Sequence, residues 1–242
     1  VEGRVNLVAE IPGLLKVDGD LLCRFNALGD LILATLPSDS YVRQDDVVAG
    51  TRTIPVLVKE ELIKQAEAIC KAKPIVTVLP IPSRRIHLIV TGSEVFTGRI
   101  KDGFEPVVRR KVTEMGSDLE TVKLAPDDPD RIAEHIKDSY QAGAELILVS
   151  GGMSVDPDDL TPEGIRQSGA SVECHGFPVL PGSMFLMAYL KETPILGLSG
   201  CVLHDPVSAF DLLLPRLLAG EKIMRSDIIT LGHGGLQKKH DH

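Results

Sequence analysis

The sequence predicts an α/β fold: a three-layer α/β/α domain with a mostly parallel sheet, preceded by a small β-rich domain. Three observations lead to this prediction. After residue 85, short apolar segments alternate with helix-length amphipathic segments, as in βαβ crossovers. Residues 146–149 are apolar without interruption, which is typical of a strand buried on both faces. Before residue 85, short apolar segments are broken by turn residues, as in a small barrel or sandwich.

The first part of the chain reads mainly as strands. We expect strands at residues 5–9, 13–17, 21–25, 31–36, 54–58 and 75–79, and one helix over 59–72. Pro80, Pro82 and Ser83 predict a stiff connection after the last of these strands. The predicted division is therefore a β-rich domain over 1–85, an α/β domain over 86–222, and a short extension with a flexible tail over 223–242.

The second part alternates strand and helix. We expect strands at residues 86–90, 119–124, 146–149 and 195–198, with another around Val172. Helices are expected over 104–115, from Asp128 to Gly143, from Thr161 to Gly169, over 184–189, and from Asp205 to Gly220. The tail from Gly232, with Lys238 and Lys239, is expected to be disordered.

Three turns follow strands of the predicted parallel sheet. They are Thr91-Gly92-Ser93-Glu94, Ser150-Gly151-Gly152 and Ser199-Gly200-Cys201. Ligands bind beyond the carboxyl ends of the strands in such sheets, so the three turns predict one pocket at that edge. Each turn supplies a glycine, which lets the backbone approach a ligand, and a hydroxyl group.

The middle turn is followed at once by acidic residues. Asp156, Asp158 and Asp159 precede Thr161 and Pro162, which are expected to open a helix. Because an anion-binding turn stands beside carboxylates, the pattern indicates a site for a phosphorylated ligand together with a cation or proton donor. The alternative is that the aspartates are loop and capping residues, and that Glu94 is an exposed turn residue.

Composition excludes several classes of function. Among the 242 residues the formal net charge is −8, so no basic surplus is available for nucleic acid. No apolar run reaches the length that spans a membrane. The four cysteines, Cys23, Cys70, Cys174 and Cys201, lie far apart, which indicates reduced thiols and a cytoplasmic location. The sequence begins at Val1, so we expect it to be part of a longer protein.

Residues 86–220 resemble the molybdopterin-binding domain of molybdenum-cofactor biosynthesis proteins, the family of the molybdopterin molybdenumtransferases and gephyrin. Those proteins carry Thr-Gly-Asp-Glu, Ser-Gly-Gly-x-Ser-Val and Leu-Pro-Gly-Asn-Pro turns. The corresponding stretches here are Thr91-Gly92-Ser93-Glu94, then Ser150-Gly151-Gly152-Met153-Ser154-Val155 with Asp159 downstream, then Leu198-Ser199-Gly200-Cys201. Residues 1–85 resemble only a divergent branch of molybdopterin-binding proteins.

The resemblance implies a domain that binds molybdopterin or its adenylylated form. For the full enzymes of the family, the resemblance also implies that they exchange the adenylyl group for molybdate. Cofactor binding would fall to Thr91, Gly92, Ser93, Ser150, Gly151, Gly152, Met153, Ser154, Ser199 and Gly200. Glu94 and Asp159 would hold Mg²⁺ or accept protons as catalytic residues. The resemblance further implies a homo-oligomer, dimer or trimer, and contact with other molybdenum-cofactor proteins.

Departures from the family pattern leave three hypotheses open. Ser93 stands where the family has aspartate, and Ser199 and Cys201 stand where it has proline and asparagine. The residues after Gly220 are also too few for the small C-terminal domain of the full transferase. The first hypothesis is a molybdotransferase-like enzyme, the second a non-catalytic carrier or sensor of the pterin. The third is a nucleotide hydrolase related to the competence-damage family. Cys201 near His204 and Asp205 is read mainly as a buried residue, with a thiol nucleophile as the alternative.

Overall fold

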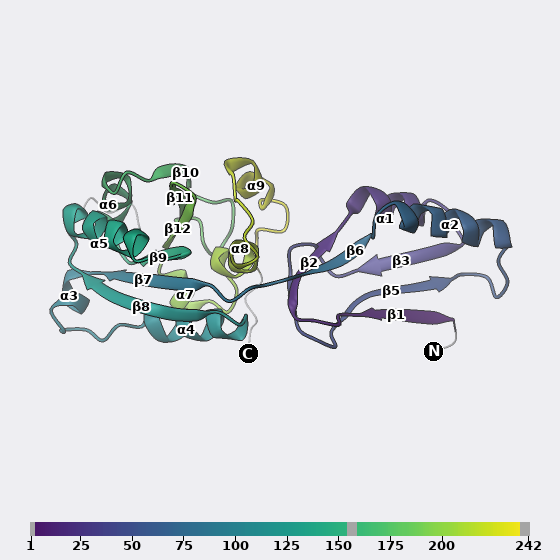
Figure 1. Cartoon of the computed structure of the whole chain (residues 1–242), viewed down its shortest axis with the longest axis horizontal. Coiled ribbons are helices and arrows are strands. Elements are labelled where there is room, and N and C mark those ends of the chain that lie inside the picture. Colours follow the sequence, from purple (N-terminus) through teal and green to yellow (C-terminus); the bar gives the residue numbers. More distant parts are fainter. Residues whose placement is uncertain (1–2, 154–158, 238–242) are drawn as a thin grey trace. The chain divides into compact units, whose positions relative to one another are not determined.

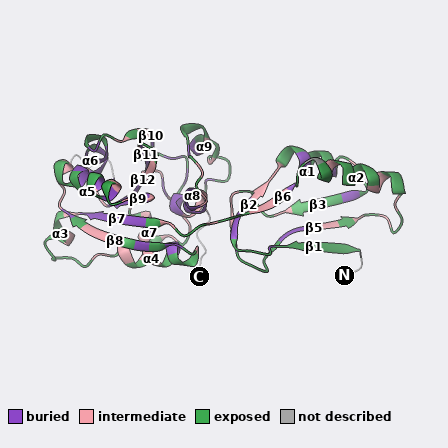
Figure 2. Ribbon diagram, in the orientation of Figure 1, coloured by how far each residue is buried: buried purple, intermediate pink, exposed green. Residues whose placement is uncertain are grey.

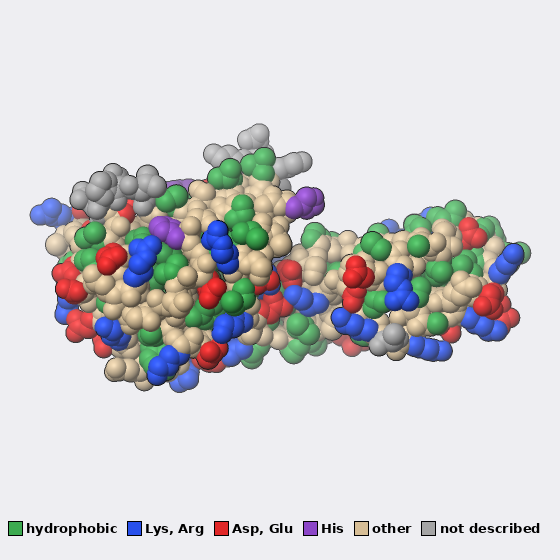
Figure 3. All heavy atoms as spheres, turned by 90° about the horizontal axis from the view of Figure 1, so that it is seen from above, with side chains coloured by type: hydrophobic (Ala, Val, Ile, Leu, Met, Phe, Trp, Pro, Cys, Tyr) green, Lys and Arg blue, Asp and Glu red, His purple; other side chains and the backbone are tan. Residues whose placement is uncertain are grey.

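The structure is a computed structural model, and it describes residues 3–153 and 159–237. Contacts within the chain divide it into two compact units, Val1–Ile81 and Pro82–His242 (Figure 1). None of the helices in the described ranges has the length and apolarity needed to cross a bilayer. On the face shown in Figure 3, acidic and basic side chains are interspersed.

The first unit contains two three-stranded antiparallel sheets and two helices. One sheet has the order β1-β5-β3 and the other β4-β2-β6. The strands are β1 (Arg4–Val8), β2 (Gly13–Val17), β3 (Leu31–Thr35), β4 (Tyr41–Val42), β5 (Val47–Thr53) and β6 (Val76–Pro80), and the helices are α1 (Gly19–Asn26) and α2 (Glu60–Ala72). The core of this unit includes Leu21 and Phe25 of α1, Leu31 and Leu33 of β3, and Ala66 of α2.

Two of the strands predicted for the first unit are wrong. Residues 21–25 lie in α1, because the Asp18 carboxylate caps the helix by accepting a hydrogen bond from the Leu21 backbone N–H (3.0 Å). Residues 54–57 form bends and Val58 belongs to no strand, since Pro55 has no N–H for a ladder. The other predicted strands and the helix over 59–72 are confirmed to within a few residues.

The second unit is built on a six-stranded sheet of order β10-β11-β12-β9-β7-β8. The four strands from β12 to β8 are parallel, while β10 and β11 join antiparallel at one edge. This confirms the predicted α/β fold with a mostly parallel sheet. The strands are β7 (Arg85–Thr91), β8 (Asp118–Ala125), β9 (Leu146–Ser150), β10 (Ser171–His175), β11 (Leu186–Leu190) and β12 (Thr193–Leu198).

Helices cover both faces of this sheet (Figure 1). They are α3 (Ser93–Phe96), α4 (Phe104–Glu114), α5 (Pro129–Gln141), α6 (Thr161–Gln167), α7 (Cys201–His204), α8 (Ala209–Leu218) and α9 (Arg225–Thr230). Ile89 and Ile147 pack with Ile132 of α5, and α6 adjoins α5 on that face. Leu88 and Leu148 are neighbours of Ile89 and Ile147 in their strands, so they point to the opposite face of the sheet. Both are fully buried, and α4 and α7 lie on that face (Figure 2).

Three helix predictions in the second unit also need correction. Residues 184–189 were expected to be helical, but β11 occupies 186–190 and pairs antiparallel with β12. The helix expected from Asp205 begins instead at Ala209, because Ser208 and Asp211 form a capping box. Leu160, not Thr161, precedes α6, and it provides no side-chain cap.

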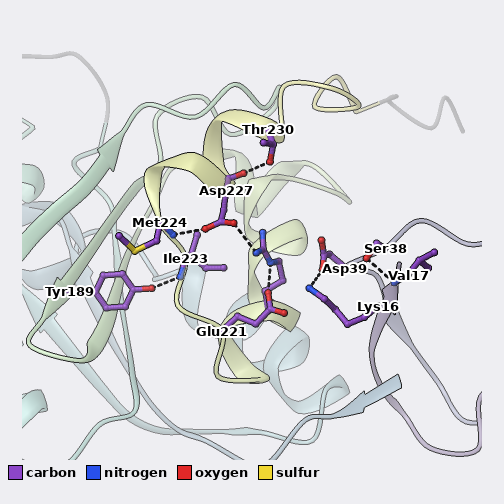
Figure 4. Close-up of polar contacts among 11 residues, drawn as sticks. Lys16, Val17, Ser38, Asp39, Tyr189, Glu221, Ile223, Met224, Asp227 and Thr230 are labelled. Carbon is purple, nitrogen blue, oxygen red and sulfur yellow. Dashed lines mark hydrogen bonds and ion pairs between the residues drawn. The ribbon is translucent and has the colours of Figure 1, made fainter. Parts of the chain in front are cut away.

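The chain after α8 packs back on the second unit (Figure 4). The Tyr189 hydroxyl accepts a hydrogen bond from the Ile223 backbone N–H (2.7 Å), and Arg216 pairs with Glu221 (2.7 Å). Leu236 forms a bridge with Leu180, so the expected disorder is wrong for 232–237. Residues 238–242, including Lys238 and Lys239, lie outside the described part.

Candidate ligand-binding site at the carboxyl edge of the sheet

The three predicted turns follow strands that are neighbours in the sheet. Val90 of β7 lies opposite Ser150 of β9, and Ser150 lies opposite Leu198 of β12. Because these strands are parallel, all three turns leave the sheet at the same edge.

A cavity of about 500 Å³ opens at this edge. Its volume is in the range that holds small organic ligands. The turns after β9 and β12 both contribute to its wall. The lining residues are Phe104, Gly151, Gly152, Met153, Asp159, Leu180, Pro181, Gly182, Ser183, Met184, Ser199, Gly200 and Cys201.

Packing requires the two glycines of the middle turn. Gly151 has φ +92, and a Cβ there would lie 2.4 Å from the Thr91 carbonyl oxygen. Gly152 has φ +52, and a Cβ there would lie 2.8 Å from Thr161 Oγ1. Since any side chain would collide with the protein on the inner side, the turn presses closely on Thr91 and Thr161 while its backbone lines the cavity.

Thr91 ties this turn to its surroundings instead of lining the cavity. Its buried hydroxyl donates to the Ser150 carbonyl oxygen (3.0 Å) and lies 3.0 Å from Thr161 Oγ1. Because a hydroxyl has one proton, Thr161 must then be the donor to Thr91. The hydroxyl of Ser150 is itself buried, and within the described residues it has no hydrogen-bond partner.

Met153 anchors the other end of the middle turn. Met153 lines the cavity, but it is only 3% exposed and belongs to the hydrophobic core on the α5 face. A Cβ on Gly197 would lie 2.8 Å from Met153 Cε, so the thioether occupies the space above that glycine. The turn is therefore fixed to β12 as well as to β7 and α6.

The first predicted turn contributes less to the cavity. The Ser93 backbone N–H donates to Asp127 Oδ2 (2.8 Å), and the Asp127 N–H donates to Ser93 Oγ (3.4 Å). Glu94 is exposed on α3. Thr91, Gly92, Ser93, Glu94 and Ser150 are thus placed at the correct edge of the sheet but outside the cavity lining.

One described carboxylate, Asp159, belongs to the cavity wall, and it is partly buried. Asp156 and Asp158 lie outside the described residues, as does Ser154. Over 3–153 and 159–237 there is no group of three His, Cys, Asp or Glu side chains arranged to hold a metal ion. Metal binding by Glu94 and Asp159 stays a prediction.

The third turn places a hydroxyl beside a thiol. Ser199 Oγ lies 3.1 Å from Cys201 Sγ. Burial raises the pKa of the Cys201 thiol, because the charged thiolate loses its hydration. The thiol is therefore neutral at pH 7, which argues against a nucleophilic role.

Part of the cavity was not predicted from the sequence. Phe104, at the start of α4, and residues 180–184 line it. Gly182 has φ +125, and a Cβ there would lie 2.6 Å from Ala209 Cβ, so this segment packs closely on the start of α8. The Pro181-Gly182 dipeptide is a turn signal that points to this segment, but the helix expected over 184–189 led away from it.

The fold and the cavity define an α/β domain with a small-ligand site formed by turns at the carboxyl edge of its parallel sheet. Residues 87–219 match the family model described as a probable molybdopterin binding domain. The chain belongs to this family.

Known proteins that resemble the chain fall into two groups. The molybdopterin molybdenumtransferase of Synechococcus elongatus is 24% identical over 228 residues, which is 89% of this chain and 55% of that protein. A CinA-like protein of Mycobacterium leprae is 34% identical over 87 residues, 36% of this chain and 20% of that protein. The chain thus spans about half, or less, of the length of these relatives.

One solved structure adds to these comparisons. The molybdopterin biosynthesis enzyme MoaB of Thermus thermophilus overlaps with a TM-score of 0.49 at 23% identity. The overlap covers 57% of this chain and 98% of that chain.

Proposed function

We propose that the second unit binds molybdopterin, or its adenylylated form, in the cavity at the carboxyl edge of the sheet. The observation that carries the proposal is the position of Gly151 and Gly152. Both line a cavity of about 500 Å³ in a domain of the molybdopterin-binding family. A glycine turn at a strand end presents backbone N–H groups, which suit the terminal phosphate of the pterin.

The remaining cavity residues divide between polar and apolar contacts. Gly151, Gly152 and Met153 can offer backbone groups, and Ser199, which also lines the cavity, can offer a hydroxyl. Phe104 offers an aromatic surface for a flat heterocycle. Ser154 follows Met153 directly and remains in the proposed set, although it lies outside the described residues.

Mg²⁺ fits this proposal through Asp159. The ion is usually held by one or two carboxylates together with ligand phosphates and waters, so a single cavity carboxylate is compatible with it. Glu94 would have to contribute from outside the cavity lining. The ion would supply positive charge that lets Asp159 and an anionic ligand share the cavity.

Two activities at this site are distinguished by chemistry. A transferase would insert molybdate and release AMP from the adenylylated pterin, whereas a carrier or sensor would hold the pterin unchanged. The carrier is favoured by Ser93, whose backbone N–H and hydroxyl are engaged by Asp127. Cytoplasmic location, self-association as a dimer or trimer, and contact with other molybdenum-cofactor proteins are further parts of the proposal.

The test is to mix the protein with adenylylated molybdopterin, molybdate and Mg²⁺, and to measure pterin binding and AMP release. Release that requires molybdate supports the transferase, and binding without release supports the carrier. Hydrolysis of unrelated nucleotides supports the third hypothesis. Absence of pterin binding overturns the proposal.

A pair of variants localises the site. Asp159→Asn should weaken any Mg²⁺-dependent binding or turnover, because it removes the cavity carboxylate. Glu163→Gln alters an exposed carboxylate on neighbouring α6 and should leave both unchanged. Equal behaviour of the two variants would remove Asp159 from the proposed site.

A further inference from the structure

The sheet β1-β5-β3 of the first unit has one covered face and one open face. Leu31 and Leu33 of β3 are buried in the core that α1 and α2 complete. Ile32 and Ala34 alternate with them, point to the other side, and are exposed. Figure 2 shows β1 exposed along its whole length.

A cavity of about 450 Å³ lies on the open face. Its wall is largely apolar: Ile32 is 39% exposed, Leu36 40% and Val47 44%. Apolar side chains gathered in a concave surface, instead of scattered singly, mark a place where another apolar group binds.

Two arginines also line this cavity. Arg4 and Arg52 are directly opposite each other on β1 and β5. Like charges at directly opposite positions of an antiparallel pair are destabilising unless an anion compensates them. Within the described residues neither side chain makes an ion pair with a carboxylate, although the protein as a whole carries a net charge of −8.

The guanidinium of Arg4 is held in place over the sheet. Its Nε donates to Asn6 Oδ1 (2.7 Å), and a Cβ on Gly50 would lie 3.4 Å from both Nε and Nη2. The missing side chain at Gly50 thus makes room for the guanidinium above β5. The Nε proton is already used by Asn6, and among residues 3–153 and 159–237 no acceptor is found for the Nη groups, which can therefore meet an acceptor from outside.

We propose that this cavity binds a small organic anion with an aliphatic body. Its carboxylate or phosphate lies between Arg4 and Arg52, and its aliphatic part covers Ile32, Leu36 and Val47. Guanidinium groups bind both kinds of head group in a bidentate manner. A second copy of the same face is disfavoured as the occupant, since it would bring four arginines together.

The test uses methyl NMR spectroscopy of the whole chain with three probes: octanoate, 1-octanol and inorganic phosphate. Octanoate should shift the methyl signals of Ile32, Leu36 and Val47 in a saturable manner. Its affinity should be higher than that of 1-octanol or inorganic phosphate. Octyl phosphate is then compared with octanoate. Whichever of the two binds more tightly shows whether the preferred head group is a phosphate or a carboxylate. Octanoate that shifts no signal of these three residues overturns the proposal.

Variants show whether the arginines carry the binding. Arg4→Gln with Arg52→Gln should weaken octanoate binding at least tenfold, with the 1-octanol response unchanged. Arg24→Gln, which removes an exposed arginine from α1 of the same unit, should leave octanoate binding unchanged. In the unaltered protein the octanoate affinity should also fall as salt is raised. Equal affinity of the double variant and the unaltered protein overturns the proposal, and neither result depends on pterin binding.

Discussion

The hydroxyl groups of Thr91 and Thr161 lie 3.0 Å apart, and this buried pair joins the end of β7 to the first residue of α6. The Gly151-Gly152 turn packs against this pair, with Gly151 next to Thr91 and Gly152 next to Thr161. The shape of the cavity wall therefore depends on two side chains that do not line the cavity.

Replacing Thr91 should test whether the cavity wall depends on its hydroxyl. Thr91→Val keeps the shape but removes the hydroxyl, leaving the Thr161 hydroxyl and the Ser150 carbonyl each without this partner. We expect a loss of about 1–3 kcal/mol in the free energy of unfolding, measured with urea, and weaker pterin binding. Thr91→Ser keeps the hydroxyl and should restore most of both. A valine variant as stable as the unaltered protein would contradict this role.

The glycine turn can be tested with an internal control. Gly151→Ala adds a Cβ that meets the Thr91 carbonyl oxygen at 2.4 Å, in a backbone conformation that alanine disfavours. Gly169→Ala has a similar φ, +89, but its Cβ meets nothing within 4 Å. We expect about 1 kcal/mol of destabilisation for Gly169→Ala, a larger one for Gly151→Ala, and loss of pterin binding in the latter alone. If the two alanine variants had the same melting temperature and the same pterin affinity, the close contact of Gly151 with Thr91 would be unimportant.

An ion pair between α4 and α8 should stabilise the second unit. Lys111 Nζ pairs with Asp211 and also donates to the Pro206 carbonyl oxygen (3.2 Å), and only 9% of the lysine side chain is exposed. Lys111→Met leaves a partly buried carboxylate without its cation, so we expect a loss of about 3 kcal/mol in urea denaturation. The double variant Lys111→Met with Asp211→Asn should lose less than the sum of the two single changes. Strict additivity would mean that the two side chains do not interact.

The buried His87 and the partly buried His135 should make stability fall in mild acid. Burial is the largest cause that lowers the pKa of His87 and of His135, and the cation of Lys123 lowers both further. The unfolded chain, with a histidine pKa of about 6.5, therefore takes up protons first as the pH falls. The stabilising contribution is present above pH 6.5 and is lost as pH drops towards the lower folded-state values.

The measurement is the free energy of unfolding between pH 7.5 and 5.5. His87→Leu should flatten this dependence, because it removes a group that is 4% exposed and whose Nδ1 has no partner within the described residues. Glu145 should not interfere, since hydrogen bonds from Arg85 and Arg84 lower its pKa from 4.5 and its contribution is lost only below that pH. An unchanged slope in the leucine variant would assign the effect to other groups.

Sequence periodicity was enough for the parallel sheet and insufficient for short apolar segments. Residues 146–149 could be assigned because an uninterrupted apolar run next to helix-length segments fits a parallel strand. Residues 186–190 are as short and apolar, and residues 21–25 are apolar except for Arg24, but run length does not separate strand from helix. The Asp18 cap makes residues 21–25 helical, and the pairing of Met187 with Leu196 makes residues 186–190 a strand. The second is a contact between two strands, which local propensity does not reveal.

The same limit applies to the cavity. Turns at the ends of β9 and β12 could be found because glycines and hydroxyls follow apolar runs directly. Leu180 to Met184 were missed, because their position depends on long-range packing of Gly182 against Ala209 at the start of α8. The hydrogen-bonded pair of Thr91 and Thr161 could not be predicted either, since 70 positions separate the two residues in the sequence.

The thioether of Met153 fills the space above Gly197, and this has an evolutionary consequence. A side chain at position 197 would need the volume that Met153 now occupies, since even a Cβ would lie 2.8 Å from its terminal methyl carbon. Among natural relatives, the two positions should covary in size: wherever 197 carries a larger residue, 153 should carry a smaller one. The loop after β9 and the strand beside it can then diverge only as a matched pair.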